Sequence, residues 1–377
     1  MCADYIQEIE NKLGIPTMGR VERFPEIFEY LMKLSIERPI TLFIDEFQEF
    51  FKVNKSVYSD MQRIWDMYHT KAHINLIVCG SIFSMMTKIF KDKKEPLYNR
   101  QTRFMSIKPF TPAVLKEIIA EYNPNYTAED LLALYSFTGG VAKYVQLLVD
   151  AGATTKTKML NHIIKADSVF LGEGKAILIE EFGKDYGVYF SILSAIARGK
   201  TLRSEIEQIV GREIGGYLTK LEKEYEVITK NQPIFEKSST KNVRYTIEDN
   251  FFSFWFRFVY KYNYMLEIEN YDAVKTIINR DYETFSGKML ERYFKRILVE
   301  SKTYTRIGSW WDRKGENEID IVAENELNDE AVFIEVKRKE ENFDAIALNE
   351  KVDAFTRATG KFKDYTVSQK GLSMTDM

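Results

Sequence analysis

The hydrophobic pattern near the start of the chain predicts two strands of a parallel sheet. Apolar residues fill most of Ile40–Ile44 (ITLFI) and Ile74–Val78 (INLIV), as expected of strands that are buried on both faces. The stretch 57–68 between them has the apolar spacing of a helix. A strand, a helix and a second strand in this order predict an α/β fold with a doubly wound sheet.

Polar residues follow both predicted strands. Asp45 and Glu46 come directly after the first strand, and Gly80 and Ser81 come shortly after the second. In P-loop ATPases, two acids at such a strand end hold Mg²⁺ through water and polarise the attacking water, and a hydroxyl on a neighbouring strand reads the γ-phosphate. A strand that simply leaves the core at a polar loop gives the same pattern, so both interpretations stay open.

The middle of the chain has the pattern of a winged helix. Apolar residues at helical spacing predict three helices, over 189–199, 201–211 and 212–225. Two strand-like segments follow at 226–231 and 242–249, joined by a polar loop. Three helices and a hairpin in that order are typical of a winged helix. The aromatic run 251–260 has helical spacing and is interpreted as core packing.

Basic residues on the third helix and around the hairpin loop predict contact with the phosphates of DNA. They are Arg212, Lys220 and Lys223 on the helix and Lys237, Lys241 and Arg244 near the loop. Glutamates interleave with them. Gly215 and Gly216 weaken a helix unless something approaches its backbone closely, and either DNA or another part of the chain fits that role. A scaffold between domains therefore stays open as the alternative.

The C-terminal part holds the sharpest chemical pattern. Segments 317–325 and 331–339 alternate as the strands of a hairpin do, which places Asp320 near Glu335 and Lys337. Metal-assisted phosphodiester hydrolysis needs two acids that hold Mg²⁺ and a lysine that positions water. A hairpin with charges on its solvent face is the alternative. Charges within apolar strands are costly, which favours a site.

A helix over 345–359 and a strand over 362–368 are predicted to complete an αβ unit against this hairpin. Taken together, these stretches resemble the archaeal-type ATPases of the AAA+/STAND superfamily that carry a C-terminal domain similar to restriction endonucleases. The resemblance runs from about residue 30 to the C-terminus and rests on IDEFQEF, VCGS, EPLYNRQTRFMSIKPF, FTGGVAKYVQLL, NVRYTIEDNFFSFWFRFV, GSWWDRKGENEIDIVA and FIEVKR.

The resemblance implies an incomplete doubly wound P-loop ATPase core with a helical lid, then a winged helix, then an α/β domain of the PD-(D/E)xK type. The implied boundaries are 1–165, 180–265 and 280–377. ATP and Mg²⁺ are the implied cofactors. The implied nucleotide-site residues are Asp45 and Glu46 as catalytic acids, with Asp45, Ser81, Arg100 and Arg103 binding the cofactors. In the C-terminal domain they are Asp320, Glu335 and Lys337 as catalytic residues and Glu291, Asp320 and Glu335 as metal ligands.

The phosphate-binding loop of that family, GxxxxGK[ST], is not found in the sequence. The stretch GEGKA at 172–176 lacks the first glycine at the right spacing and the hydroxyl after Lys175, and it follows no strand. Helices are predicted before Asp45, over 3–13 and 24–37. We therefore expect an N-terminally truncated ATPase that does not hydrolyse ATP on its own. A missing N-terminal segment or an oligomer would supply the rest of the nucleotide site.

Composition indicates an ordinary cytoplasmic protein. The 377 residues are 45% hydrophobic and 14% aromatic, which is sufficient for two or three domains. Apolar runs are shorter than the roughly 18 residues that span a membrane, and the N-terminus is too polar for a signal peptide. Two cysteines give no disulfide framework. The net charge of −3 means that DNA affinity must come from local patches.

Two classes of function stay open. One is an ATPase-family enzyme that acts on DNA through a winged helix and a metal-dependent nuclease domain. The other is a non-catalytic module in which degenerate ATPase and nuclease folds bind DNA or a protein. A basic groove leading to Asp320 favours the enzyme, whereas a pocket filled by the chain's own Arg or Lys favours the module.

Overall fold

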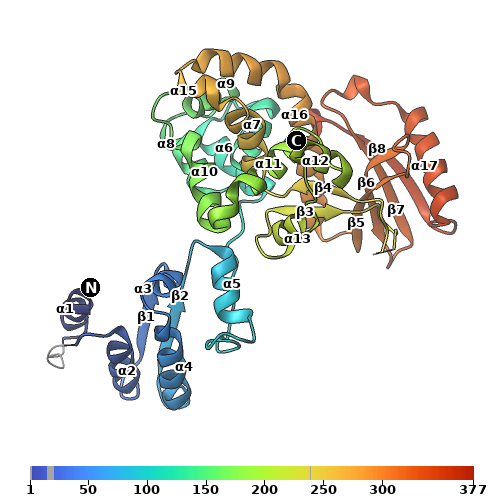
Figure 1. The fold of residues 1–377 in the computed structure, drawn as a ribbon. Coiled ribbons are helices and arrows are strands. Elements are labelled where there is room, and N and C mark those ends of the chain that lie inside the picture. The colour runs from blue at the N-terminus through green and yellow to red at the C-terminus, as the bar shows by residue number, and fades with distance from the viewer. Residues whose placement is uncertain (1, 15–20, 238) are drawn as a thin grey trace. The chain divides into compact units, whose positions relative to one another are not determined.

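The computed structural model describes residues 2–14, 21–237 and 239–377. The chain forms two compact units that divide after Ser106 (Figure 1). Within the described residues, none of the helices has both the length and the apolar character that crossing a bilayer requires.

Two parallel strands form the sheet of the first unit. These are β1 (Ile40–Ile44) and β2 (Ile74–Val78), paired from Ile40 opposite Ile74 to Ile44 opposite Val78. Both strands lie where the sequence predicts them. The helices of this unit are α1 (Cys2–Leu13), α2 (Phe24–Leu34), η1 (Phe47–Glu49), α3 (Phe50–Val53), α4 (Ser56–Tyr68) and α5 (Phe83–Lys91). The predicted helices correspond to α1, α2 and α4, and α2 ends at Leu34 instead of at residue 37.

One face of this sheet carries the core of the first unit. Leu42 and Leu76 pack there with buried side chains of α2 and α4. Side chains alternate along a strand, so Phe43 and Ile77 point to the other face, where they are 59% and 42% exposed. The prediction of strands buried on both faces is therefore wrong for the described residues.

The second unit opens with packed helices: α6 (Pro112–Tyr122), α7 (Ala128–Thr138), α8 (Ala142–Asp150), α9 (Lys156–Ile163) and α10 (Val169–Phe182). A capping box between Thr127 and Asp130 begins α7, and Gly139, with a φ of 61°, ends it. A side chain at Gly140 would meet the carbonyl oxygen of Phe110 at 2.4 Å. These two glycines thus terminate α7 just before α8 begins.

A unit of three helices and a hairpin follows, in the order that the sequence predicts. After η2 (Gly183–Asp185) come α11 (Tyr186–Ala197), α12 (Arg203–Val210), α13 (Gly215–Lys223) and the antiparallel strands β3 (Ile228–Asn231) and β4 (Arg244–Ile247). We call this the helix–hairpin unit. It leads into α14 (Asn250–Phe254), the π-helix η3 (Trp255–Tyr260), α15 (Asn263–Glu267) and α16 (Tyr271–Ser301). Phe254, Phe256 and Phe258 are fully buried, so the aromatic run is core packing, as predicted.

The chain ends in a four-stranded sheet of order β5-β6-β7-β8. Its elements are β5 (Arg306–Trp311), β6 (Glu318–Asn325), β7 (Glu330–Val336), η4 (Glu340–Asn342), α17 (Ala345–Thr359), β8 (Thr366–Leu372) and η5 (Met374–Asp376). The antiparallel pair β6 and β7 is the predicted hairpin, and α17 is the crossover to the parallel strand β8. Strand β8 begins at Thr366 instead of at residue 362, because Phe362 has a φ of 64° and its ring is buried in the core.

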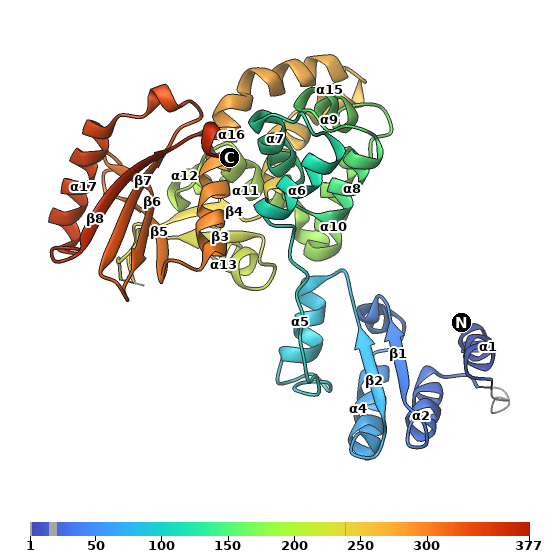
Figure 2. The ribbon, with the colours of Figure 1, turned by 180° about the vertical axis from the view of Figure 1, so that it is seen from behind.

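Helices α16 and α17 lie on opposite faces of this sheet (Figures 1 and 2). Ile334 and Val336 of β7 share a core with α16, whereas Phe333 packs against Phe355 of α17. Alternation along β7 therefore sends Glu335 to the same face as Phe333, toward α17.

Arg338, just after β7, joins the sheet to two helices. One of its terminal nitrogens donates to Ser286 Oγ of α16 at 2.5 Å, and the other donates to Glu129 Oε2 of α7 at 2.5 Å. The guanidinium also lies over the ring of Tyr282, 5.6 Å from its centroid. The end of β7 is thus hydrogen-bonded to both α7 and α16.

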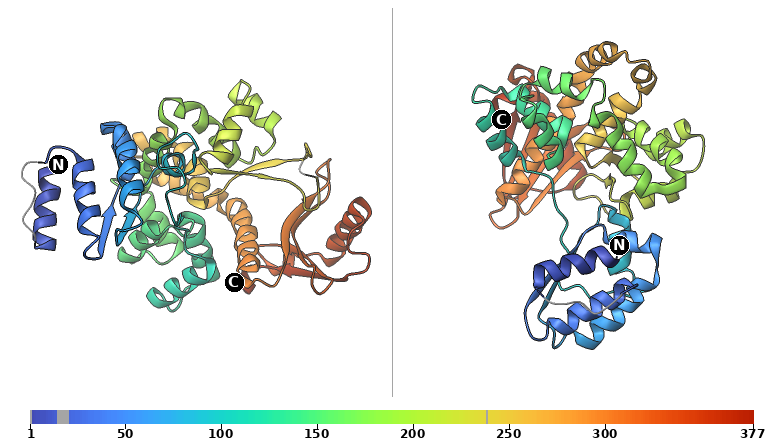
Figure 3. Two further views of the ribbon diagram at one scale, coloured as in Figure 1. Left: turned by 90° about the horizontal axis from the view of Figure 1, so that it is seen from below. Right: turned by 90° about the vertical axis from the view of Figure 1, so that its left-hand side faces the viewer.

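The loop of the helix–hairpin unit is built into the C-terminal sheet, and the long hairpin reaches it in Figure 3. The amide of Ile234 donates to the carbonyl of Ser309 at 2.8 Å, and the indole of Trp311 donates to Asn242 Oδ1 at 2.9 Å. Ile234 is buried in one core with Phe333 and α17. The hairpin loop is therefore a structural part of the sheet's core and not a free wing.

One continuous core runs through the second unit, from Leu115 in α6 to Leu372 in β8. The helices α6 to α9 consequently pack with the C-terminal half of the chain. The sequence groups them instead with the strands β1 and β2, in a domain that ends near residue 165.

Candidate functional site

The first acid site lies at the C-terminal ends of β1 and β2. Because Ile44 pairs with Val78, the residues that follow each strand meet. The amide of Cys79 donates to the carbonyl of Ile44 at 3.0 Å, and the amide of Phe47 donates to the carbonyl of Cys79 at 2.8 Å. The parallel pairing thus brings together the two polar strand ends that the sequence singles out.

Neutral hydrogen-bond donors surround Glu46. Its Oε2 accepts from Ser81 Oγ at 2.8 Å and from the side-chain amide of Gln48. These hydrogen bonds, first that of Gln48 and then that of Ser81, hold the pKa of Glu46 below its ordinary value. Glu46 itself has a φ of 48°, a left-handed conformation that is uncommon outside glycine and asparagine. The predicted neighbours Glu46 and Ser81 therefore lie in direct contact.

Gln48 is a site residue that the sequence reasoning missed. It is buried to 1% exposure, and its Oε1 has no hydrogen-bond partner. A side chain at Gly80 would meet that oxygen at 2.1 Å, so the glycine leaves the room that Gln48 occupies. Two features of the sequence could have identified Gln48. It stands two residues after Glu46, and a glycine follows the second strand, where a larger residue would leave no room for the amide.

Asp45 is held by a thiol and a backbone amide. Its Oδ1 accepts from Cys79 Sγ at 2.6 Å and from the amide of Glu46 at 2.9 Å. The hydrogen bond to Asp45, together with burial, raises the pKa of the Cys79 thiol. Carboxylate and hydroxyl oxygens are donors that Mg²⁺ prefers, and within the described residues no cationic side chain is paired with Asp45 or Glu46. The donor types at this strand end are those that a divalent cation prefers, but among the described residues no group of three or more His, Cys, Asp or Glu is arranged to hold one. We call Asp45, Glu46, Gln48, Cys79 and Ser81 the first acid site.

The second acid site lies on the C-terminal sheet and contains Asp320, Glu335, Lys337 and Lys351. Glu335 is 6% exposed. Its Oε1 accepts from Lys337 Nζ at 2.7 Å and from Lys351 Nζ at 2.9 Å, and its Oε2 accepts from Lys351 Nζ at 3.0 Å. The predicted pair of Glu335 and Lys337 shares a face as expected. Lys351, from α17, is the member that the sequence reasoning missed.

Asp320 accepts a hydrogen bond from the amide of Val336 at 2.8 Å. Burial raises the pKa of Asp320 to about 6, and the charge of Glu335 adds to this rise. Burial, followed by the charge of Asp320, also raises the pKa of Glu291 to about 8. Burial alone would lower the pKa of Lys337, but its hydrogen bond to Glu335 and the neighbouring acids raise it. Glu291 is therefore protonated in most molecules at neutral pH.

The predicted metal group of Glu291, Asp320 and Glu335 is not assembled. Among the described residues, no group of three or more His, Cys, Asp or Glu is arranged to hold a metal ion. Glu291 belongs to α16, which covers one face of the sheet, whereas Glu335 points to the other face, toward α17. Two carboxylates alone can hold Mg²⁺, but here both oxygens of Glu335 already bind ammonium groups. The second acid site does not fit a divalent cation in this arrangement.

Most of the chain is similar to a known archaeal protein. The uncharacterized protein MJECL04 of Methanocaldococcus jannaschii is 33% identical over 314 residues, which are 79% of this chain and 67% of that protein. Residues 6–148 match a family described as an ATPase domain predominantly from Archaea. The chain belongs to the archaeal-type P-loop ATPase family.

Further matches of this ATPase-family chain are shorter or less similar. Residues 255–349 match a family of archaeal and bacterial proteins of unknown function. The uncharacterized protein MJ0424 of the same archaeon is 34% identical over 56 residues, 15% of this chain and 54% of that protein. A solved structure, the Walker-type ATPase PABY2304 of Pyrococcus abyssi, gives a TM-score of 0.48 at 19% identity over 67% of this chain and 75% of that one.

Two arginines of the ATPase-family chain were expected near the nucleotide. Arg100 instead forms a two-point ion pair with Asp66, at 2.9 and 3.2 Å, and donates to the carbonyl of Tyr98. Asp66 lies near the end of α4, which leads into the start of β2, whereas Asp45 follows the end of a parallel strand. Arg100 is therefore bonded toward the opposite edge of the sheet. Arg103 is exposed in an irregular segment.

The expected DNA-contacting residues separate into two groups. Arg212, Lys220, Lys223, Lys237 and Lys241 are exposed, and no ion pair is found for them within the described residues. Arg244 instead pairs with Glu318 at 2.8 Å and lies over the ring of Trp311. The backbone of α13 is approached by Arg203, whose guanidinium would lie 3.1 Å from a side chain at Gly215. Another part of the same chain thus accounts for that glycine.

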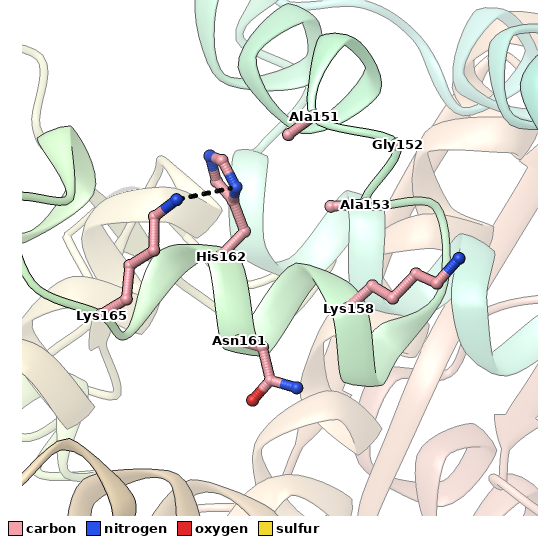
Figure 4. A pocket seen from close by; sticks show the side chains of 7 residues that line it. All are labelled: Ala151, Gly152, Ala153, Lys158, Asn161, His162 and Lys165. Atoms are coloured by element: carbon pink, nitrogen blue, oxygen red, sulfur yellow. Dashed lines mark hydrogen bonds between the residues drawn. The ribbon is translucent and has the colours of Figure 1, made fainter.

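A shallow depression of about 370 Å³ lies between α8 and α9 (Figure 4). Its side chains include Lys158, Asn161, His162 and Lys165, and Lys165 Nζ lies 3.4 Å from His162 Nδ1. Burial, and then the charge of Lys165, lowers the pKa of His162. None of the predicted nucleotide or metal residues lines this depression.

Proposed function

We propose that this member of the archaeal ATPase family is a DNA-binding protein whose second unit contacts DNA without cutting it. The observation that supports this most is a set of exposed cations on and beside α13, namely Arg212, Lys220 and Lys223, for which the described part of the chain provides no ion-pair partner. Exposed lysines and arginines that are not neutralised by the protein's own acids are available to phosphates.

The geometry of α13 suits contact with a phosphate backbone. Lys220 and Lys223 are three residues apart, so they share one face of the helix. Leu218 and Leu221 on the other side are buried in the core. Glu213 and Glu224 are also exposed nearby, which makes the surface a mixed one. The basic side chains on this face would contact one line of phosphates along the DNA backbone. Because the chain has a net charge of −3, its affinity for DNA must come from such a local group of cations.

In this proposal the hairpin holds α13 in place. Its loop carries exposed Lys237 and Lys241, but Ile234 anchors the loop in the core of the C-terminal sheet. The helix–hairpin unit and the sheet are thus packed together. We infer that α13 is the DNA-contacting element of the proposed winged helix and that the hairpin fixes its position.

The nucleotide part of the proposal rests on family membership and on the first acid site. In an ATPase site that a phosphate-binding loop from elsewhere completes, we assign Asp45 to Mg²⁺, Glu46 to the attacking water and Ser81 to orientation of Glu46 through its hydroxyl. Bound Mg²⁺ would neutralise phosphate charge there. Cleavage of DNA at Asp320 and Glu335 is left out of the proposal, because the second acid site does not fit a metal ion.

Fluorescence anisotropy with a labelled 20-base-pair duplex tests this proposal. The variant Arg212→Glu/Lys220→Glu/Lys223→Glu should bind at least tenfold more weakly at low salt. The slope of log affinity against log salt should fall by about 2 to 3, since each lost phosphate contact removes about 0.9. A matched control, Lys116→Glu/Lys158→Glu/Lys165→Glu, makes the same charge change on α6, α9 and the turn after α9 and should keep the affinity within about twofold.

Equal loss of affinity in both variants would mean that only net charge matters, and the assignment to α13 would be wrong. Absence of binding by the unmodified chain would contradict DNA binding and favour the protein-binding module. Release of cut DNA in Mn²⁺ buffer, lost in Glu335→Gln, would contradict binding without cleavage.

A further inference from the structure

Glu335 is enclosed within the C-terminal sheet. It lies on β7, which has β6 on one side and β8 on the other, and it is 6% exposed. Opposite it on β8 is Gly371. A side chain at Gly371 would meet the ring of Phe343 at 2.6 Å, so the neighbouring strand contributes no polar group at this point. The carboxylate therefore depends on side chains from its own strand and from α17.

Helix α17 delivers Lys351 to this carboxylate. Asp344 caps the helix by accepting from the amides of Ile346 and Ala347 at 2.9 and 3.0 Å. Leu348 and Val352 then bury the inner face of the helix against the sheet. Lys351 stands beside them, and its ammonium reaches both oxygens of Glu335. The side chain of Lys351 is only a quarter exposed, so the contact is partly shielded from solvent.

We propose that Lys351 is a built-in cation that takes the place of a divalent metal ion at Glu335 and excludes Mg²⁺ and Mn²⁺ from the second acid site. The proposal stands on the contacts of Lys351 and does not depend on whether α13 binds DNA.

Geometry makes the ammonium and a metal ion mutually exclusive. A carboxylate that holds Mg²⁺ does so at 2.0–2.1 Å, with nearly octahedral surroundings. Lys351 Nζ already lies at 2.9 and 3.0 Å from the two oxygens, and Lys337 Nζ lies at 2.7 Å from one of them. A metal ion would have to enter between the carboxylate and two ammonium groups, where like charges repel strongly because water is scarce.

Charge balance points the same way. When Asp320 and Glu335 are ionised, Lys337 and Lys351 neutralise both charges within the protein. Within the described residues the first acid site has no such partners, since Glu46 accepts from the neutral groups of Gln48 and Ser81. An external cation therefore gains much less attraction at the second site than at the first.

Manganese binding, measured from the electron paramagnetic resonance of free Mn²⁺, tests this inference. All proteins carry Asp45→Asn and Glu46→Gln, so that the first acid site does not contribute. Lys351→Met should create one Mn²⁺ site and tighten binding at least 30-fold over the parent. Lys351→Arg keeps the positive charge and should behave as the parent. Arg357→Met removes one charge from the exposed side of α17 and should also leave binding unchanged.

The site created by Lys351→Met should disappear when Glu335→Gln is added. Because loss of Lys351 leaves Glu335 with one counter-ion, Lys351→Gln serves as a second variant that can still donate a hydrogen bond and keep the fold. Parent protein that binds Mn²⁺ as tightly as Lys351→Met would overturn the inference. So would the failure of both folded variants, Lys351→Met and Lys351→Gln, to bind the ion.

Discussion

The two acid sites are built on the same plan but are neutralised differently. In each, a carboxylate stands at or near the end of a strand, and a second acid lies close by. Around Glu46 the donors are a hydroxyl and an amide, and the side chain is exposed. Around Glu335 the donors are two ammonium groups, and the side chain is buried. Neutral donors orient a carboxylate and leave its charge available, whereas cationic donors orient it and cancel its charge.

This difference also separates what each site contributes to stability. A buried carboxylate with two lysines is costly to disrupt, since removal of the acid leaves two cations facing each other. An exposed carboxylate with neutral donors can replace them with water.

Glu335→Gln should lower the free energy of unfolding around β7 by about 2–4 kcal/mol, because Lys337 and Lys351 lose their shared counter-ion. Glu46→Gln should lower that around β1 by less than about 0.5 kcal/mol. Hydrogen exchange followed by mass spectrometry gives these values when peptides around β7 and β1 of each variant are compared with those of the parent. Glu330→Gln, on an exposed position of the same strand, is the control and should change little. Equal and small losses at both acid sites would remove the contrast.

The two units should respond to pH with opposite sign. Burial raises the pKa of Glu291 to about 8, so the folded second unit holds a proton that the unfolded chain releases near its ordinary pKa of 4.5. Stability of this unit should therefore fall as the pH rises from about 5 to 8. Glu46 has a lowered pKa, so its contribution is present above 4.5 and is lost as the pH falls.

Urea unfolding at pH 6, 7 and 8, followed by the fluorescence of Trp310 and Trp311 in proteins that carry Trp65→Phe and Trp255→Phe, measures the first of these effects. Glu291→Gln should remove a decrease on the order of 2 kcal/mol across this range. Asp320, whose pKa burial raises to about 6, contributes mainly below pH 7. Glu283→Gln changes an exposed acid of the same helix and should keep the pH dependence of the parent. An unchanged slope in Glu291→Gln would show that Glu291 is ionised when folded.

Ser81→Ala should cost the first unit about 0.5–1 kcal/mol, because one hydrogen bond to an exposed carboxylate is replaced by water. The pKa of Glu46 should rise toward its ordinary value, since Ser81 is one of the two donors that lower it. Hydrogen exchange of peptides around β2, measured at pH 4 and pH 7, reports both changes. Ser191→Ala, an exposed serine on α11, is the matched control. A loss of stability as large as that caused by Glu335→Gln would mean that water does not replace the hydrogen bond of Ser81 at the first acid site.

The smallest expected effect concerns ATP. The 377 residues contain no GxxxxGK[ST] loop, whose amides and lysine normally cradle the β- and γ-phosphates. Purified chain should therefore release no phosphate from ATP, and Glu46→Gln should be indistinguishable from it in a coupled phosphate assay. Steady hydrolysis that vanishes in Glu46→Gln would show that another part of the chain holds the phosphates.

Periodicity was sufficient for the framework of both sites. Apolar runs located β1 and β2, and because parallel strands end at one edge, Glu46 and Ser81 could be expected to meet. Alternation along β7 likewise placed Glu335 and Lys337 on one face. These are consequences of local geometry, which a sequence displays directly.

Residues that arrive from a distant element were beyond such reasoning. Lys351 reaches Glu335 only because α17 crosses back over the sheet, and nothing in its helix distinguishes it from a surface lysine. Arg100 was assigned to the nucleotide, yet Asp66 holds it by two hydrogen bonds. Ile234 carried a usable signal, since an apolar residue beside Phe235 is unexpected in a polar loop and indicates burial.

The two residues that follow β7 point in different directions and link two parts of the second unit. Lys337 and Arg338 are neighbours in the chain, yet one bonds to Glu335 and the other to Glu129 at the start of α7. A displacement of α7 along its axis would pull on Arg338 and shift the strand end by which Lys337 is positioned. Helix α7 is thereby mechanically linked to the charge balance at Glu335 through the peptide bond between Lys337 and Arg338.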